Sequence, residues 1–278
     1  MTPEKVYHYT TKETALEKIL TTQKIRFNFL GQTNDPRESK EWGYPILNPP
    51  FSLNETSQEE TIRWLDEYSK IESEAKRIRN KEWQILCFSQ DDPRLKTQKG
   101  DISLYHLYGY SRSRMWSQYA GNHTGICFIF DREKLNDRIH EEIIQEDLRF
   151  FQGSVEYSDM KSSTSLIVNY EDIKKHGITE GIRKFFYNDY KAAFLTKSKE
   201  WESEYEYRWL IHSQDEQLQH ISVEGIISGL LVGVDFPEVY EPSLIAICKK
   251  LNILGGKMDW RQGIPIAQFN SIYNPDNK

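Results

Sequence analysis

The stretch from residue 201 to 209 alternates between ionic and aromatic side chains, and this alternation constrains the fold more than any other feature of the chain. In a β-strand every second side chain shares a face, so the two sets would lie on opposite faces. The ionic set is Glu204, Glu206 and Arg208, and the aromatic set is Tyr205, Tyr207 and Trp209. Neighbouring carboxylates raise each other's pKa and a guanidinium lowers it, so the ionic row could tune a reactive carboxylate. The alternative is an antiparallel strand with a solvated outer face.

The remaining pattern predicts an α+β fold with a split, mostly antiparallel sheet and flanking helices, because strands and helices do not alternate regularly. Seven strands are predicted, at 6–9, 25–29, 84–89, 124–130, 153–157, 204–211 and 229–234. Thr10 and Glu13 have the spacing of a capping box, which predicts a helix after the first strand. Further helices are predicted at 114–119, at 180–197 and from Pro237 to about Leu251, with Gly255 and Gly256 ending the last one.

The length of 278 residues fits a single domain, 1–278, with a helical insertion at about 50–82. Residues 58–80 repeat apolar side chains at helical spacing and carry charge on the outer surface. The sequence from Asn34 to Pro36 predicts a turn, and Arg37 and Glu38 after it are candidates to reach a site. Residues 91–101 predict a loop.

Charge and cysteine usage exclude several classes of protein. A net charge of −6 argues against broad capture of nucleic acid and against a metal-independent nuclease, which would need a denser basic surface. Cys87, Cys127 and Cys248 lie singly in apolar runs, as buried reduced thiols do. No His or Cys spacing indicates a metal site, so no metal is expected. The chain has no run of eighteen apolar residues and no apolar leader, so we expect a cytoplasmic protein without a membrane partner.

Six short motifs occur in the order found in the bacterial family known as domain of unknown function 2971, which this chain resembles over roughly residues 6 to 210. They are Tyr7–Thr10; Asn34–Glu38; Cys87–Ser89; Met115–Ala120 followed by His123–Gly125; Val155–Tyr157; and Lys197 ahead of Trp201, Glu204, Glu206 and Arg208. The family name assigns no activity, so this resemblance leaves the chemistry open.

The first strand, helix and return strand also resemble, more distantly, the opening of the ADP-ribosyltransferases. The resemblance implies that NAD is the substrate, that His8 bonds the ribose of its nicotinamide half, and that Tyr119 or Trp116 stacks on nicotinamide. It implies that Glu206 stabilises the cation formed as nicotinamide leaves, with Glu204 completing a Glu-x-Glu pair. Phe27 and Phe29 stand where a stacking tyrosine would follow the helix, so the stacking ring stays open between the two candidates. Further residues expected to contact NAD are Tyr9, Thr10, Asn34 and Trp201.

The residue types suit this chemistry. A preorganised carboxylate helps most where positive charge develops, so Glu206 would act in the transition state while Arg208 holds it charged. Glu204 would take the proton of the acceptor. Arg112 and Arg114 could contact phosphates or form a solvated edge, and His123 is a secondary candidate.

We therefore expect an NAD-dependent ADP-ribosyltransferase acting on a macromolecular acceptor, nucleic acid or protein, in a toxin or phage-defence setting with a possible antitoxin or defence partner. The alternative is a non-catalytic module that recognises a nucleotide or a protein.

Overall fold

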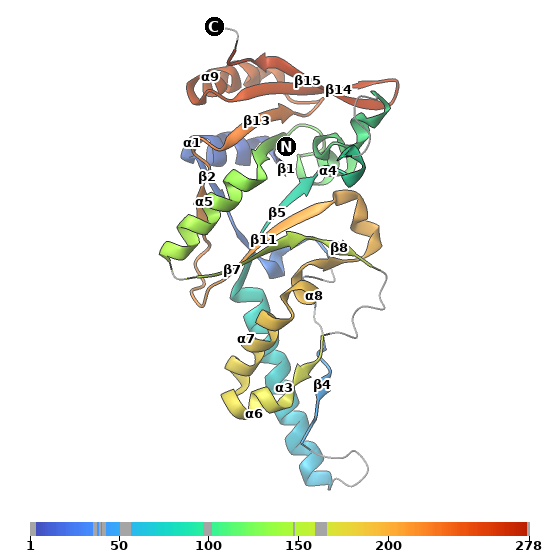
Figure 1. Ribbon diagram of the computed structural model, residues 1–278, viewed down its shortest axis with the longest axis vertical. Helices are drawn as coiled ribbons and strands as arrows, with labels where there is room; N and C mark the ends of the chain where they lie inside the picture. Colours follow the sequence, from blue (N-terminus) through green and yellow to red (C-terminus); the bar gives the residue numbers. More distant parts are fainter. Residues whose placement is uncertain are drawn as a thin grey trace.

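The computed structural model describes residues 4–35, 38, 40, 43–50, 57–96, 102–146, 148–158 and 166–276. It has the predicted α+β architecture, built around one nine-stranded sheet (Figure 1). The strands of this sheet are β1 (Lys5–Thr10), β3 (Asn28–Phe29), β5 (Trp83–Gln90), β6 (Ile126–Asp131), β7 (Arg149–Ser154), β11 (Glu206–His212), β13 (Ile227–Val232), β14 (Leu254–Arg261) and β15 (Ile264–Tyr273). Their order is β15-β14-β13-β6-β1-β5-β11-β7, and β3 pairs with β5 beside β1. The pair β13–β14 is parallel, and the other described pairs of the sheet are antiparallel.

The largest apolar core lies between the sheet and three helical segments. They are η1 with α1 (Thr14–Ile19 and Leu20–Thr22), α5 (Arg132–Gln145) and α9 (Glu241–Leu251). Leu20, Leu135 and Leu244 from these segments are buried against strand residues such as Phe88 and Trp209. A smaller core contains Tyr9 from the sheet and Trp116 from α4 (Ser113–Tyr119). Val6 of β1 packs in the larger core and Tyr7 and Tyr9 in the smaller one, so both faces of this strand are held by packed side chains.

A helical lobe extends away from the sheet, in the lower half of Figure 1. It combines α3 (Gln58–Lys81) with α6 (Tyr170–His176), α7 (Ile178–Asn188), α8 (Tyr190–Phe194) and the short pair β4 (Ile46–Leu47) and β9 (Val168–Asn169). A complete capping box between Ser57 and Glu60 begins α3. The predicted helix in the 50–82 insertion is therefore confirmed, although residues 51–56 lie outside the described part. Residues from 166 onward complete the core of this lobe.

Glu82 joins this lobe to the sheet. Its carboxylate is buried and accepts hydrogen bonds from Arg183 Nη2 in α7 at 2.9 Å and from Arg77 Nη2 in α3 at 2.6 Å. His212 Nε2, at the end of β11, lies 2.8 Å from the same carboxylate. A buried carboxylate needs such partners, so the junction between lobe and sheet depends on residues from three elements.

Several predicted element ends differ in the structure. Thr11, not Thr10, accepts from the backbone N–H of Thr14, at 3.3 Å, so the helix begins one residue later than predicted. The strand predicted at 25–29 is broken at Phe27 into β2 (Lys24–Arg26) and β3, because β2 pairs with β12 (His220–Ser222) and β3 with β5. The strand predicted at 153–157 is likewise divided between β7 and β8 (Glu156–Tyr157), which pairs with β10 (Thr196–Lys197).

The helix predicted at 180–197 is interrupted at Asp189, between α7 and α8. At the C-terminal end, the prediction that Gly255 and Gly256 stop the last helix is wrong. Asn252, with φ of 56°, ends α9, and both glycines lie in β14. Gly256 is needed there because an added Cβ would lie 2.7 Å from the Gln268 carbonyl oxygen. The hairpin β14–β15 was not predicted.

Candidate functional site

A cavity of about 690 Å³ opens where β1 and β3 diverge along the same edge of β5. β1 pairs with β5 only at Gln90 and Ser89, and β3 pairs with it only at Ile85 and Gln84. Residues 86–88 lie between these pairings and line the cavity. The split of the sheet therefore creates the cavity, whose volume is typical of small-molecule sites.

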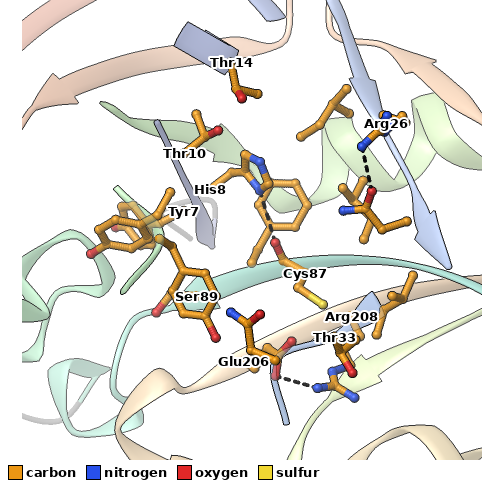
Figure 2. Close-up of a pocket in the computed structure, with 18 of the residues that line it drawn as sticks. Tyr7, His8, Thr10, Thr14, Arg26, Thr33, Cys87, Ser89, Glu206 and Arg208 are labelled. Carbon is orange, nitrogen blue, oxygen red and sulfur yellow. Dashed lines mark hydrogen bonds and ion pairs between the residues drawn. The ribbon is translucent and has the colours of Figure 1, made fainter. Parts of the chain in front are cut away.

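The two halves of the cavity lie on opposite faces of β5, as Figure 2 shows with His8 on one side and Glu206 on the other. Ser89 is paired with Glu206 and Cys87 with Arg208, so these four side chains share a face. His8 packs on Phe88, whose side chain points the other way. Cys87 joins the halves, because its carbonyl oxygen lies 3.2 Å from His8 Nδ1 and its side chain contacts Glu206.

A buried ionic cluster forms one end of the cavity. Lys197 Nζ lies 2.9 Å from Glu204 Oε2 and 3.0 Å from Glu206 Oε2, so a single ammonium bridges two carboxylates. Tyr119 donates a hydrogen bond to Glu204 Oε1 at 2.9 Å. The three charged side chains are each no more than 6 % exposed. The charges in this cluster are therefore stabilised by one another and not by solvent.

Arg208 completes the cluster from β11. Its Nη2 donates to Glu206 Oε2 at 2.8 Å, and its Nη1 donates to Glu38 Oε1 and, at 2.7 Å, to the Phe194 carbonyl oxygen. Arg208 is fully buried and Glu38 is 4 % exposed. The buried Arg79 interacts electrostatically with Glu38 and Arg208, and also with the buried Asp35. With all seven side chains ionised, four carboxylates face three cations, so the cluster has a net negative charge and can bind a positive ligand.

The surroundings shift the pKa values of Glu204 and Glu206 in opposite directions. Burial by itself raises the pKa of Glu206, but Arg208 and Lys197 outweigh burial and lower this pKa below its usual range. Burial raises the pKa of Glu204, and Lys197 offsets only part of the rise, to which Glu206 adds. Glu206 is thus the permanently charged member of the pair, and Glu204 is the member suited to exchange a proton.

His8 is neutral at physiological pH. Burial lowers its pKa to about 4, and the hydrogen bond to Cys87 opposes this only in part. A carbonyl oxygen can only accept, so Nδ1 carries the proton and Nε2 has a free lone pair. His8 can therefore accept a hydrogen bond from a ligand hydroxyl.

Residues 115–209 match the family model of DUF2971, a protein family of unknown function. No curated protein and no solved structure matches the chain.

The DUF2971 match contains most of the ionic cluster but not all of the cavity. Tyr119, Lys197, Glu204, Glu206 and Arg208 fall inside it. The strand that carries His8, the basic residues of β2 and Glu38 precede it in the chain. The matched segment thus supplies most of the acidic end of the cavity, to which Thr33 and Glu38 add, and the first forty residues and β5 supply most of the remaining lining.

Eight of the ten residues predicted from the sequence line this one cavity: His8, Tyr9, Thr10, Asn34, Tyr119, Glu204, Glu206 and Arg208. Trp116 does not, because it is 1 % exposed and its indole N–H donates to the Tyr110 carbonyl oxygen at 2.8 Å. Trp201 does not line the cavity either, and its ring lies below Arg114, at 4.4 Å, and Lys197, at 5.0 Å. Between the two rings considered for stacking, Tyr119 is the one at the cavity.

The strand-face interpretation of residues 204–208 is corrected in two ways. Glu204 is the last residue of the 3-10 helix η7 (Lys199–Glu204), and Tyr205, with φ of 44°, turns the chain into β11. The left-handed turn brings both glutamates to the same Lys197. The solvated-face alternative is wrong, because every residue of β11 is buried.

Other candidates have structural roles or lie elsewhere. Arg112 donates to Ser89 Oγ at 3.1 Å and to the Gln90 carbonyl oxygen at 2.8 Å, so it holds two segments together and is not a solvated edge. His123 packs near Trp260, away from the cavity lining. Arg37 lies outside the described residues, whereas Glu38 reaches the site as expected.

Apart from Arg208, the cations of the site were not predicted from the sequence. Lys197 appeared only as part of a motif, and nothing in the local pattern indicates that it is buried. Lys18, Lys24 and Arg26 line the exposed part of the cavity. In the part of the chain that the structure describes, no cluster of His, Cys, Asp or Glu could hold a metal ion, and no helix is long and apolar enough to cross a membrane.

Proposed function

We propose that this protein is an NAD-consuming ADP-ribosyltransferase whose reaction takes place in the cavity between β1 and β3. The observation that carries the proposal is the charge polarity of this one cavity. Lys18, Lys24 and Arg26 line one part of it, and Glu38, Glu204 and Glu206 line the other. In Figure 2, Arg26 lies on the His8 side of β5 and Glu206 on the opposite side.

NAD has the matching polarity. Its diphosphate is anionic, and the nicotinamide ring carries a positive charge. The basic residues suit the diphosphate, since Lys and Arg bind phosphate oxygens through charge-assisted hydrogen bonds. The net negative ionic cluster suits the nicotinamide riboside. A ligand of uniform charge would be repelled at one end.

The proposed reaction uses the two glutamates differently. The bond from ribose C1′ to the nicotinamide nitrogen breaks, its electron pair stays on nicotinamide, and positive charge develops on the ribose. Glu206 stabilises this charge because it is ionised and already oriented by Arg208. The acceptor then forms a bond to C1′ and gives its proton to ionised Glu204. Tyr119 orients Glu204 through its hydrogen bond and presents a ring to the cavity.

The position of His8 sets a condition on how NAD binds. The side chains of His8, in β1, and Glu206, in β11, lie on opposite sides of the neighbouring strand β5. One ribose therefore cannot contact both side chains from within a single half of the cavity. The nucleotide must instead cross the gap beside residues 86–88. His8 Nε2 would then accept from a ribose hydroxyl at the entrance of the gap.

The test is binding and turnover of NAD by the purified protein. We expect calorimetry to show binding of NAD and weaker binding of NADH, whose ring is uncharged, and we expect free nicotinamide to appear. Glu206→Gln should stop its release, whereas Glu202→Gln, an exposed change in the same helix η7, should not. Absence of NAD binding would refute the proposal.

A recognition module is the second candidate, and a specific observation favours it. Both glutamates are already paired with Lys197 or Arg208, as in a rigid binding site. NAD binding without nicotinamide release, even with a cell lysate supplying acceptors, would support this alternative.

A further inference from the structure

The acidic end of the cavity contains three buried polar atoms that have no hydrogen-bond partner among the described residues. They are Nε of Arg208, Oε2 of Glu38 and Oγ1 of Thr33. All three residues line the cavity, and Figure 2 shows Thr33 and Arg208 at the same end as Glu206. Buried polar groups are rarely left unpaired, so three in one place require an explanation.

The chemistry of these atoms defines what would satisfy them. Arg208 Nε–H can only donate, Glu38 Oε2 can only accept when ionised, and the Thr33 hydroxyl can do either. A single group that satisfies all three must combine a donor with an acceptor. A carboxylate lacks the donor and an ammonium lacks the acceptor, whereas a primary carboxamide has both.

We infer that Thr33, Glu38 and Arg208 form a carboxamide subsite that recognises the amide group of nicotinamide. This inference rests on the proposed function and names the part of NAD that the acidic end selects. The amide N–H₂ donates to Glu38 Oε2, and its oxygen accepts from Arg208 Nε–H and the Thr33 hydroxyl. The subsite lies beside Glu206, to which Arg208 also donates, at 2.8 Å. Holding the amide therefore places the nicotinamide next to the carboxylate that acts on its ribose bond.

Replacing Glu38 with glutamine should reverse which ligand the subsite prefers. Arg208 Nη1 donates to Glu38 Oε1, so in Glu38→Gln the amide oxygen must take that position. The N–H₂ of the glutamine then replaces Oε2, which changes an acceptor into a donor. A ligand with a carboxylate in place of the carboxamide should now fit better than NAD.

The experiment measures calorimetric affinities for NAD, nicotinic acid adenine dinucleotide and ADP-ribose. We expect the wild type to bind NAD roughly tenfold more tightly than the nicotinic acid analogue, and Glu38→Gln to reverse this order. Thr33→Val should weaken NAD binding several-fold and leave binding of ADP-ribose, which has no nicotinamide, unchanged. Glu17→Gln, an exposed change on the first helix, serves as the control.

Equal wild-type affinities for NAD and its analogue would overturn the inference, as would an unchanged ratio of NAD to ADP-ribose affinity in Thr33→Val. The second result keeps the test decisive if Glu38→Gln does not fold. The experiment distinguishes failure of the carboxamide subsite from failure of the proposed function. If nicotinamide is released but neither variant changes ligand preference, only the subsite is wrong. If the wild type does not bind NAD, both are wrong.

Discussion

The ammonium group of Lys197 lies 3.0 Å from Oε2 of Glu206, and both side chains are buried. Lys197 belongs to the short strand β10, and Glu206 begins β11, so the contact joins the central sheet to a segment that lies outside it. The same ammonium lies 2.9 Å from Oε2 of Glu204, so Lys197 bridges the two carboxylates.

Lys197→Met should be strongly destabilising, because it leaves the carboxylates of Glu204 and Glu206 with one cation fewer in a buried site. We expect the free energy of unfolding to fall by about 3 kcal/mol or more. Urea denaturation of the wild type and variant measures this change. The exposed Lys250→Met should change stability by less than about 0.5 kcal/mol. A similarly small change for Lys197→Met would contradict the buried bridge.

Arg208→Lys tests the guanidinium geometry. Arg208 donates to two carboxylates and a carbonyl oxygen, and the ammonium of lysine cannot reproduce this planar arrangement. We expect a loss of about 2 to 4 kcal/mol in stability together with loss of any nicotinamide release. Thermal and urea denaturation measure the change in stability. Arg261→Lys, on the surface, should leave stability unchanged in both experiments. An Arg208→Lys variant with wild-type stability would show that the buried contacts are not maintained in solution.

Glu206→Gln should lower the rate of nicotinamide release by roughly 10² to 10³ while NAD affinity changes little, since the charge is used mainly in the transition state. Single-turnover measurements with NAD and calorimetry separate the two effects. An equal loss of affinity and rate would instead show that Glu206 contributes to ground-state binding.

Glu204→Gln should affect transfer to an acceptor more than hydrolysis of NAD, because water is a competing nucleophile that can lose its proton to bulk solvent. Burial raises the pKa of Glu204, so transfer in the wild type should increase as the pH rises through this pKa and should level above it. The measurement is the pH profile of labelled-NAD transfer. A flat profile in the wild type would remove Glu204 as the proton acceptor.

His8 should make stability dependent on pH. Its folded pKa is about 4 and its ordinary value is 6.5, so between these values the unfolded chain binds more protons than the folded one. Stability is therefore complete above pH 6.5 and is lost as the pH falls toward 4, by about 2 kcal/mol between pH 7 and pH 5. His8→Asn should remove this part of the pH dependence in urea titrations, whereas the exposed His176→Asn should not.

Much of the fold could be predicted because its signals are local. Short apolar runs located β1, β5 and β6, the alternation of ionic and aromatic residues located β11, and helical periodicity located α3. The C-terminal hairpin was missed, because Gly255 and Gly256 resemble a helix stop until Gln268 is known to lie against them. Likewise, only the competing pairings of β2 with β12 and β3 with β5 show why the strand breaks at Phe27.

The sequence by itself determined the residue types of the candidate site: an early His8, a Tyr119 in a helical motif, and Glu204 and Glu206 near Arg208. The tertiary structure alone decided which of them meet. It placed His8 and Glu206 on opposite faces of β5, turned Trp116 into the core, and brought Lys197 to both glutamates and Glu38 to Arg208. The physical reason is that burial and charge pairing depend on long-range contacts. A lysine seven residues before Glu204 becomes its ion partner only because the 3-10 helix η7 folds the chain back between them.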